Sequence, residues 1–325
     1  MRVLVVKTSS MGDVVHTLPA VTDLLRHHPD AEVDWVLESA FAAIPALHPG
    51  VRRVIPIAWR KWRRALGRRS TWQAMAQARR ALREQRYDAV IDLQGMVKSV
   101  LWGVQANGPL MGFDRRSVRE RLAAWCYTRV AEVPKAMHAV QRSRLLMARL
   151  LDDPPPEGPP DFGLRAPPPS WPAPPRAVVL IPNASRPEKF WPQACWIAVG
   201  QRLLAQGLCP VVLWGSPAEQ AMASHIAQGC GGVVPPFLKV GEMAAVLAGA
   251  ELIVGLDTGF THLGAAFGRP VVGIYCDHEP GLTGLTGAGP RRSIGGCGQV
   301  PALEAVQALI DEVRAEAASR VPAAR

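Results

Sequence analysis

The opening of the chain, Met1 to Pro19 with the sequence MRVLVVKTSSMGDVVHTLP, constrains the fold more than any other stretch. Its residues 2–7 form a short run rich in β-branched apolar side chains, which is typical of a buried parallel strand. Small residues then form a turn over residues 8–13, and the apolar spacing that follows predicts an amphipathic helix over residues 14–26. In a parallel α/β sheet, such a turn lies at the carboxyl ends of the strands, where ligands bind and where free N–H groups at a helix start attract anions.

Asp13 lies at this edge and has two interpretations. As a helix N-cap, it would accept a hydrogen bond from a backbone N–H, and the spacing alone favours this role slightly. As a functional group, it would present a carboxylate to a ligand at the end of the first strand. The residues of the turn do not decide between the two.

The same alternation of strands and helices continues and predicts a doubly wound parallel sheet in each half of the chain. In the first half, we expect strands over 3–6, 33–37, 89–93 and 110–113 and helices over 14–26, 70–85, 97–105, 118–130 and 138–151. In the second half, we expect strands over 177–182, 211–214, 252–256 and 271–275 and helices over 193–206, 218–227, 240–248 and 258–267. A last helix over 302–317 could pack on either half.

Residues 152–175 separate the two halves and hold about a third of the chain's 30 prolines. Such a segment can form neither a regular helix nor a central strand, so it predicts a stiff linker. We therefore expect an N-terminal Rossmann-like domain over 1–151, the linker, and a C-terminal Rossmann-like domain over 176–325.

Composition narrows the class of partner. The chain has 325 residues, is 48% hydrophobic and has a mean hydropathy of +0.06, which is typical of a globular protein. Neither a signal peptide nor an apolar run of membrane-spanning length is evident, so we expect a cytosolic protein. The six cysteines are scattered without CxxC spacing, which predicts neither disulfides nor a zinc site.

The net charge of +10 and the pI of about 9.8 call for an acidic partner, and roughly two thirds of the Lys and Arg residues precede residue 150. The sequence lacks helix-turn-helix, zinc-finger and RNP-like patterns, which argues against nucleic acid. An anionic lipid surface or an anionic sugar remains.

Three segments of the second half could bind a nucleotide diphosphate. In the strongest, an apolar strand ends in Asp257-Thr258-Gly259 and a helix begins with His262 in its first turn. Backbone N–H groups, the Thr258 hydroxyl and the helix dipole would favour a phosphate there, although a capped helix with a satisfied histidine gives the same pattern.

The other two segments also follow strands. Ser185, Arg186 and Lys189 come after the first strand of this half, and Lys189 could neutralise a phosphate leaving group, although most single lysines are simply solvated. Glu219 stands near a helix start after the next strand and suits either helix capping or hydrogen bonds to sugar hydroxyls.

In the first half, residues 59–64 read WRKWRR and interleave tryptophan with cations. Such a segment can bind a phosphorylated or carboxylated sugar, and its indole rings can lie at the headgroup level of an anionic bilayer. A solvated basic helix would not need the two tryptophans. Further polar candidates in this half are Gln94, Lys98, Arg119, His138, Arg142 and Arg144.

Several of these motifs, taken in order, resemble the lipopolysaccharide heptosyltransferase family, most closely its type I members. They are MRVLVVKTSSMGDVVHTLPA, VIPIAWRKWRR, DAVIDLQGMVKS, HAVQRSR and LDTGFTHLGAA. The resemblance implies a GT-B glycosyltransferase, with two Rossmann-like domains whose parallel sheets face each other across a cleft, and inverting, metal-independent chemistry without a cofactor. It implies ADP-L-glycero-β-D-manno-heptose as donor and the Kdo sugar of Kdo2-lipid A as acceptor, in lipopolysaccharide inner-core synthesis. It also implies a monomer that is peripheral on the cytoplasmic face of the inner membrane.

The resemblance also implies roles for individual residues. Asp13 matches the general base, and Lys189 matches the lysine that stabilises the departing diphosphate. The donor-binding positions are Ser185, Glu219, Asp257, Thr258, Gly259 and His262. The acceptor-binding positions are Ser10, Gly12, Arg60, Lys61, Arg63, Arg64, Gln94, Lys98, Arg119 and Arg142. This chain has Asn183-Ala184-Ser185 where the family has threonines, so the hydroxyl that contacts the phosphate stays open.

Three alternatives stay open beside this prediction. A nicotinamide dehydrogenase would also be doubly wound, but GxGxxG is missing after the first strand. A non-catalytic nucleotide or lipid A binder would keep the basic surface without needing Asp13. A heptosyltransferase that adds a later core heptose would differ in the acceptor half, chiefly in residues 59–64.

Overall fold

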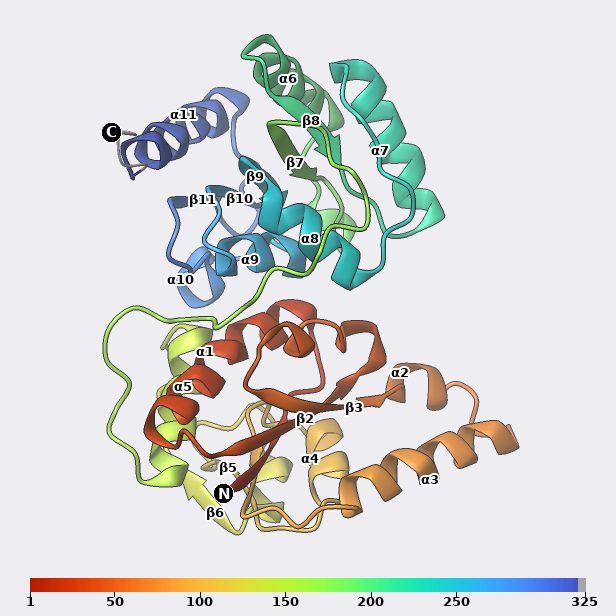
Figure 1. The fold of residues 1–325 in the computed structure, drawn as a ribbon, viewed down its shortest axis with the longest axis vertical. Coiled ribbons are helices and arrows are strands. Elements are labelled where there is room, and N and C mark those ends of the chain that lie inside the picture. Colours follow the sequence, from red (N-terminus) through yellow and green to blue (C-terminus); the bar gives the residue numbers. More distant parts are fainter. Residues whose placement is uncertain (321–325) are drawn as a thin grey trace. The chain divides into compact units, whose positions relative to one another are not determined.

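The computed structural model describes residues 1–320, and its chain divides into two compact units, Met1–Arg165 and Ala166–Arg325 (Figure 1). Each unit is built on one sheet in which all strands are parallel.

Unit 1 has a six-stranded sheet in the order β3-β2-β1-β4-β5-β6. Its elements are β1 (Arg2–Val6), α1 (Met11–His27), β2 (Glu32–Glu38), η1 (Ser39–Phe41), η2 (Pro45–Leu47), β3 (Val51–Ile57), α2 (Trp59–Trp62), α3 (Arg69–Arg83), β4 (Ala89–Asp92), α4 (Val97–Gly103), β5 (Leu110–Phe113), η3 (Arg121–Cys126), β6 (Arg129–Ala131) and α5 (Ala139–Leu151). The central β1 is buried from Val3 to Val6, as its apolar run predicts.

The strand order of unit 1 reverses direction beside β1. Strand β1 pairs with β2 on one side and with β4 on the other. The chain therefore adds β2 and β3 on one side of β1, then returns and adds β4, β5 and β6 on the other side. Such a switch point leaves a crevice at the carboxyl ends of the strands, and this is where open α/β sheets bind ligands. The turn after β1 and the start of α1 therefore lie at the expected ligand edge.

Unit 2 has a five-stranded sheet in the order β11-β10-β9-β7-β8. Its elements are β7 (Ala177–Ile181), η4 (Pro187–Lys189), α6 (Gln193–Ala205), β8 (Cys209–Val212), α7 (Pro217–Cys230), α8 (Val240–Gly249), β9 (Leu252–Leu256), α9 (Gly259–Ala266), β10 (Val271–Tyr275), α10 (Pro280–Thr283), β11 (Arg291–Gly295) and α11 (Leu303–Arg320). The first strand of the unit, β7, lies between β8 and β9, so this sheet has its switch point beside β7.

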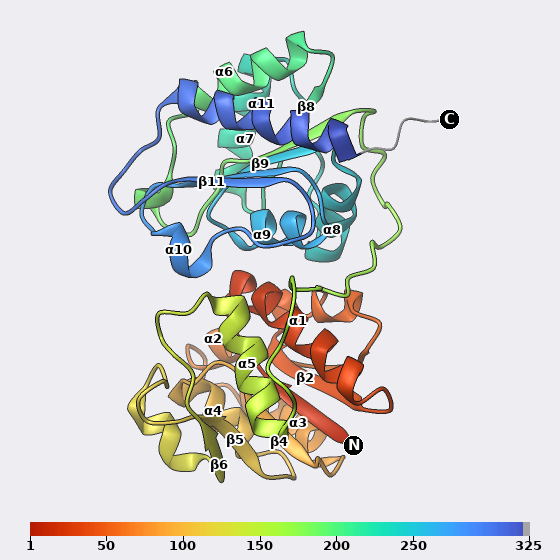
Figure 2. The ribbon, with the colours of Figure 1, turned by 90° about the vertical axis from the view of Figure 1, so that its left-hand side faces the viewer.

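The last helix, α11, packs on unit 2. It contacts β10, β11 and α6, and its buried residues Val306, Ile310 and Val313 join the core that contains Trp191 and Trp196. Figure 2 shows α6 and α11 on one face of the sheet and α8 and α9 on the other. The sequence left the location of this helix open, and the contacts with the second sheet settle it.

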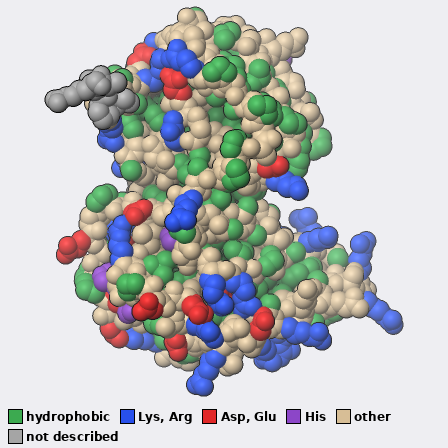
Figure 3. Space-filling view, in the orientation of Figure 1, with side chains coloured by type: hydrophobic (Ala, Val, Ile, Leu, Met, Phe, Trp, Pro, Cys, Tyr) green, Lys and Arg blue, Asp and Glu red, His purple; other side chains and the backbone are tan. Residues whose placement is uncertain are grey.

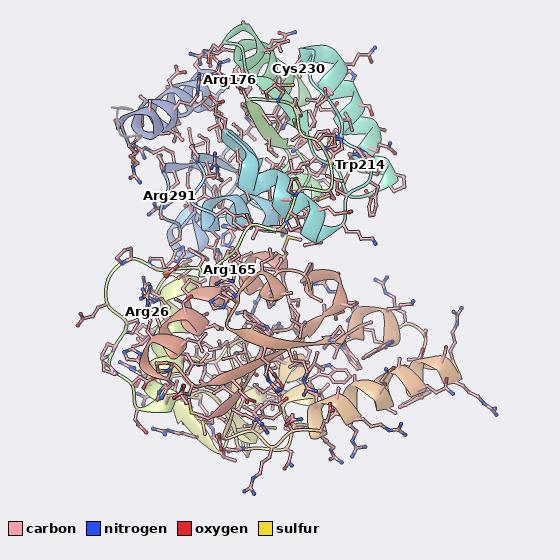
Figure 4. The ribbon with its side chains drawn as sticks, in the orientation of Figure 1. Arg26, Arg165, Arg176, Trp214, Cys230 and Arg291 are labelled. Carbon is pink, nitrogen blue, oxygen red and sulfur yellow. The ribbon has the colours of Figure 1, made fainter. Side chains whose placement is uncertain are left out.

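The proline-rich stretch between α5 and β7 contains no helix or strand. Its first part, up to Arg165, packs on unit 1: Arg165 donates its N–H to the carbonyl of Leu47 at 2.9 Å, and Phe162 is buried. Arg26, labelled in Figure 4, extends from α1 and pairs with Asp161 at 2.6 Å. The unit boundary therefore lies at residue 165, inside the segment expected to be the linker.

The secondary-structure predictions fail mainly at the sheet edges. Strands β3, β6 and β11 were not predicted, and each is an edge strand. The predicted helix over 118–130 is wrong, because the structure has the short 3₁₀ helix η3 followed by β6. Tyr127 ends η3 in extended backbone, and its hydroxyl donates to the buried Asp92 at 2.8 Å. Among the helices of residues 1–320, none has the length and apolar content needed to cross a membrane.

Candidate active site

The carboxyl edge of β1 places a buried lysine beside Asp13. Lys7 is only 8% exposed and donates from Nζ to the Leu93 carbonyl at 2.9 Å, while the same Nζ lies 3.7 Å from Asp13 Oδ1. The other carboxylate oxygen of Asp13 accepts the backbone N–H of Ser10 at 2.8 Å and the Ser10 hydroxyl at 2.9 Å. Ser10, rather than Asp13, is the N-cap of α1. The N-cap interpretation of Asp13 is therefore wrong in position, because Asp13 is the third residue of the helix and forms a capping box with Ser10. This capping bond uses one carboxylate oxygen and leaves the other facing Lys7, so it does not exclude a functional role.

The electrostatics of this pair keep Asp13 ionised. Burial alone raises the pKa of its carboxyl, but the Lys7 ammonium and the hydrogen bonds from Ser10, with a smaller effect of His16, outweigh burial and lower the pKa to about 2. Burial lowers the pKa of Lys7, and the negative charge of Asp13 partly offsets this. A carboxylate in this setting is available as a proton acceptor at any physiological pH.

The end of β4 adds a second set of polar groups to this edge. Gln94 is buried, and its side-chain oxygen accepts both the N–H and the hydroxyl of Thr8, at 2.8 and 2.7 Å. Lys98, near the start of α4, donates to the Ser9 hydroxyl at 2.7 Å. These bonds fix the turn between β1 and α1. Gln94 and Lys98, both expected to bind the acceptor, therefore also hold the backbone that carries Asp13.

Beneath Gln94 lies a buried carboxylate that the sequence analysis missed. Asp92 accepts hydrogen bonds from the N–H groups of Gln94 and Gly95 and from the hydroxyls of Ser99 and Tyr127, all between 2.8 and 3.1 Å. Burial raises the pKa of Asp92, and these donors oppose the rise. The carboxylate fixes the turn after β4, which includes Gly95 in the left-handed region at φ +69°.

The basic segment over 59–64 forms helix α2 and the turn after it. Arg60, Lys61, Arg63 and Arg64 are all exposed, as expected for groups that meet an acidic partner. The expectation for the indole rings is wrong for Trp62, which is buried and packs on Trp102 with ring centroids 5.6 Å apart. Trp59 meets the same ring at 6.2 Å. The two tryptophans anchor α2 to the unit and thereby leave its cations at the surface.

Of the remaining candidates in unit 1, Arg142 and Arg144 differ in setting. Arg142 stacks on Phe113 at 4.8 Å and donates to the Ser117 carbonyl at 2.8 Å, and burial followed by the nearby Arg119 lowers its pKa. The prediction that Arg144 is a polar candidate for binding is wrong, because its side chain is buried and pairs with Asp23 at 2.6 Å. It also donates to the carbonyls of residues 157 and 158.

The remaining candidate residues of unit 1 are His138, Arg119 and Gly12. His138 is the N-cap of α5 and accepts the N–H of Val140, and its ring meets that of His16 at 5.8 Å. Arg119 is exposed, and Gly12 lies in the first turn of α1.

All of the chain's net charge of +10 lies in residues 1–165, since acidic and basic residues balance in residues 166–325. Figure 3 shows Lys and Arg side chains over unit 1, notably along the arm formed by α3.

In unit 2, the switch point beside β7 holds a lysine, a carboxylate and a histidine. Lys189 Nζ lies 2.5 Å from Asp257 Oδ2, and His262 Nε2 lies 3.2 Å from Asp257 Oδ1. Burial raises the pKa of Asp257, but the hydrogen bonds and charges of His262 and Lys189 outweigh it and hold the pKa well below its usual range. The loop after β7 and the turn after β9 therefore meet at one point, as their adjacent strands predict.

The other expected donor-binding residues follow strands of the same unit, at the start of α9, in the loop after β7 and near the start of α7. Thr258 is the N-cap of α9, which begins at Gly259, and its hydroxyl contacts that of Thr261 at 3.3 Å. Ser185 is exposed in the loop after β7. Glu219 accepts the N–H of Gly215 at 2.8 Å near the start of α7, so it acts as a helix-capping group in this structure.

The sequence of this chain matches a known protein family over most of its length. The model for glycosyltransferase family 9 (heptosyltransferase) matches residues 75–306. The chain belongs to this heptosyltransferase family. It is 43% identical to lipopolysaccharide heptosyltransferase 1 of Pseudomonas aeruginosa over 295 residues. This match covers 88% of this chain and 82% of the relative. This heptosyltransferase is thus an enzyme, a glycosyltransferase of the type expected from its motifs.

Solved structures agree with the family. The Escherichia coli heptosyltransferase WaaC with ADP has a TM-score of 0.89 and 37% identity, over 96% of this chain and 99% of that one. WaaC with ADP-2-deoxy-2-fluoro heptose has a TM-score of 0.84 and 35% identity over the same shares. The prediction of a GT-B enzyme with two parallel-sheet α/β domains is confirmed.

Lys7 and Asp92 are two polar groups of the candidate site that sequence reasoning missed. The signals that could have identified them are a lysine directly after a buried strand and an aspartate at the end of another, because the carboxyl ends of β1 and β4 lie at the ligand edge. Within residues 1–320, no group of three His, Cys, Asp or Glu side chains could hold a metal ion, and the six cysteines are free thiols.

Proposed function

We propose that this heptosyltransferase transfers L-glycero-D-manno-heptose from ADP-heptose to the Kdo of Kdo2-lipid A, with inversion and without a metal ion. The observation that carries the proposal is that each unit places one reactive group at its switch point. Unit 1 presents an ionised carboxylate, Asp13, and unit 2 presents an ammonium, Lys189. The relatives' names support the sugar and the nucleotide, since they are lipopolysaccharide heptosyltransferase 1 and WaaC with ADP and with a fluorinated ADP-heptose.

Asp13 acts as the general base. The acceptor oxygen attacks the anomeric carbon, its proton passes to the carboxylate of Asp13, and the bond from the anomeric carbon to the β-phosphate breaks with its electron pair leaving on ADP. A carboxylate whose pKa is about 2 is a weak base toward a free alcohol. It suffices here because the hydroxyl becomes strongly acidic as its oxygen bonds to the electron-poor anomeric carbon.

Lys189 and the start of α9 stabilise the leaving diphosphate. The ammonium is held by Asp257, which is itself held by His262, so the positive charge has a fixed position before the diphosphate arrives. The first N–H groups of α9 and the Thr258 hydroxyl add donors on the same edge. These groups supply the charge that a divalent cation supplies in other glycosyltransferases.

The acceptor binds through unit 1. Its carboxylate and phosphate groups suit the forked donors of arginine, and the exposed cations of α2 and the turn after it, together with Arg119 and Lys98, provide them. The excess charge of unit 1 attracts such an acceptor over a longer range. We propose that the protein works on the cytoplasmic face of the inner membrane, where a lipid-linked acceptor is located, and that it does so as a monomer.

Asp13→Asn tests the mechanism, because it keeps the shape and removes the basicity. We expect transfer measured by mass spectrometry to fall by roughly a hundredfold or more, in line with the usual contribution of general-base catalysis, while ADP-heptose binding stays close to wild type. Transfer at the wild-type rate would mean that Asp13 only caps α1.

The same assay with Kdo2-lipid A and with an acceptor that already carries one heptose separates first-heptose transfer from a later core addition. Binding of both substrates without turnover would favour the non-catalytic binder.

A further inference from the structure

The 3₁₀ helix η3 presents two large apolar side chains to solvent. Leu122 and Trp125 are each 71% exposed, which makes them the most exposed large hydrophobic residues among those described. A 3₁₀ helix has three residues per turn, so residues at positions i and i+3 lie on the same side. The leucine and the indole ring therefore project together from one face of η3.

Helix α4 continues this apolar surface. Val97 and Leu101 on α4 and Val104 at its C-cap are between 39% and 51% exposed, and their spacing of four and three residues places them along one stripe of the helix and its end. Helices α4 and η3 pack against each other, and the carboxylate of Glu120, directly before η3, accepts the N–H of Val97 at 2.7 Å. Helix α4 can be located in Figure 2. Apolar side chains gathered in this way on a surface mark an interaction site.

Cations surround the apolar side chains. Arg115 stacks on the Trp125 ring with its guanidinium 4.5 Å from the ring centroid, and Arg116, Arg121 and Arg129 are exposed nearby in the sequence. Arg129 pairs with Asp152. Residues 114–129 contain five arginines against two carboxylates, Asp114 and Glu120, so the net charge of this stretch is positive. The surface is thus apolar at its centre and positively charged around it.

We propose that this α4–η3 surface, formed by Val97, Leu101, Val104, Leu122 and Trp125, docks the enzyme on an anionic lipid bilayer. Leucine and tryptophan enter the headgroup region, and the arginines meet the lipid phosphates. The inference rests on the proposed function, in which the acceptor is a lipid. It replaces the sequence-based expectation that residues 59–64 place their indole rings in the bilayer, because Trp62 is buried against Trp102.

The charge of the surface favours a bilayer over a second copy of the chain. Two copies meeting through the same face would bring like charges of Arg115, Arg116 and Arg121 together, whereas an anionic bilayer neutralises them. The surface is also continuous with the acceptor edge of unit 1. Lys98 lies next to Val97 on α4 and donates to Ser9 in the turn that carries Asp13. A bilayer docked on α4 would hold a lipid-linked sugar close to its binding residues.

Flotation of the full-length protein with vesicles, in the absence of substrates, tests the docking surface. The vesicles contain phosphatidylglycerol and phosphatidylethanolamine, or phosphatidylcholine alone. The test variant is Leu122→Ser/Trp125→Ser. The matched control is Leu66→Ser/Trp72→Ser, which removes another exposed leucine and tryptophan of unit 1, at 45% and 57% exposure. Thermal unfolding of both variants should match that of the wild type, because all four side chains lie at the surface.

We expect the wild type to prefer anionic vesicles and the test variant to lose roughly tenfold or more in partition, with the control within about twofold of wild type. Transfer to a water-soluble acceptor without acyl chains should be equal in all three proteins, so a failure of the proposed function shows as absent transfer in the wild type and does not affect the flotation. Equal flotation of test variant and wild type would overturn the proposal, as would loss of flotation in the control instead. Sedimentation that shows a wild-type dimer and a monomeric test variant, with unchanged flotation, would assign the surface to self-association and overturn it too.

Discussion

Replacing Lys7 by methionine should shift the pH dependence of transfer, because Lys7 keeps Asp13 ionised. Its ammonium lies 3.7 Å from Asp13 Oδ1. At an effective dielectric constant of about 20, two unit charges at this distance interact by about 4 kcal/mol, which corresponds to about 3 pKa units. The Asp13 side chain is 31% exposed, so solvent screens part of this interaction. Without Lys7, the burial of the carboxyl is less opposed, and we expect the pKa of Asp13 to rise from about 2 to roughly 4 or 5.

The sign of the effect follows from the role of Asp13. A base must be unprotonated to act, so kcat/KM falls as the pH drops through the pKa of the carboxyl. The wild type should keep its activity down to the lowest pH at which it stays folded, and the variant should lose activity between about pH 6 and 4. The lowered pKa also stabilises the wild-type fold above the ordinary carboxyl value, a contribution that disappears as the pH falls toward 2. In the variant most of this contribution should be missing.

The measurement is kcat/KM for transfer to a soluble acceptor from pH 4 to 8, with circular dichroism at each pH to show that the protein is folded. Lys98→Met is the control, since it removes a nearby half-buried ammonium that donates to Ser9 rather than to Asp13. Its acid limb should stay close to that of the wild type even if the acceptor KM rises. A folded Lys7→Met enzyme with a wild-type acid limb would refute the role given to Lys7.

Three further predictions concern other parts of the enzyme. Chelation with EDTA should leave turnover unchanged while Lys189→Ala lowers kcat by roughly a hundredfold, and a strict requirement for added Mg²⁺ or Mn²⁺ in steady-state assays would contradict this. Arg144→Met should lower the free energy of urea unfolding by about 3 kcal/mol, because it leaves the buried carboxylate of Asp23 with only the longer ion pair to Arg26 at 3.5 Å, and a loss below about 1 kcal/mol would show that the pair is dispensable. Neutralising four basic side chains should raise the acceptor KM, with an effect that shrinks at high salt, and leave ADP-heptose binding by calorimetry unchanged; loss of donor binding instead would reverse the assignment of substrates to units. The four are Arg60, Lys61, Arg63 and Arg64.

The sequence predicted those elements whose own residues determine their structure. Strands β1, β7 and β9 lie inside their sheets, and because both faces are covered their residues form continuous apolar runs. Edge strands lack this signal. Strand β3 contains exposed Arg52 and Pro56, which only an edge position tolerates, and β11 begins with two arginines.

The candidate site was predictable where a side chain directly follows a strand and less so where it depends on distant partners. Asp13 and the turn at Asp257 could be placed from the strand before them. The contact of Lys189 with Asp257 joins residues 68 positions apart and follows only from the pairing of β7 with β9. Trp62 and Arg144 have surface-like sequence contexts, and their burial depends on Trp102 and Asp23, which no local pattern reveals.

The packing of α11 on β10, β11 and α6 implies that unit 2 completes its core with its own last helix, which buries Val306, Ile310 and Val313 in that core. A fragment of residues 166–325 should therefore fold autonomously and retain the cluster of Lys189, Asp257 and His262. The intact protein then has two cooperative units, and a single midpoint of heat denaturation would not describe it. Nucleotide affinity could be titrated calorimetrically on the fragment alone, free of any contribution from the acceptor half.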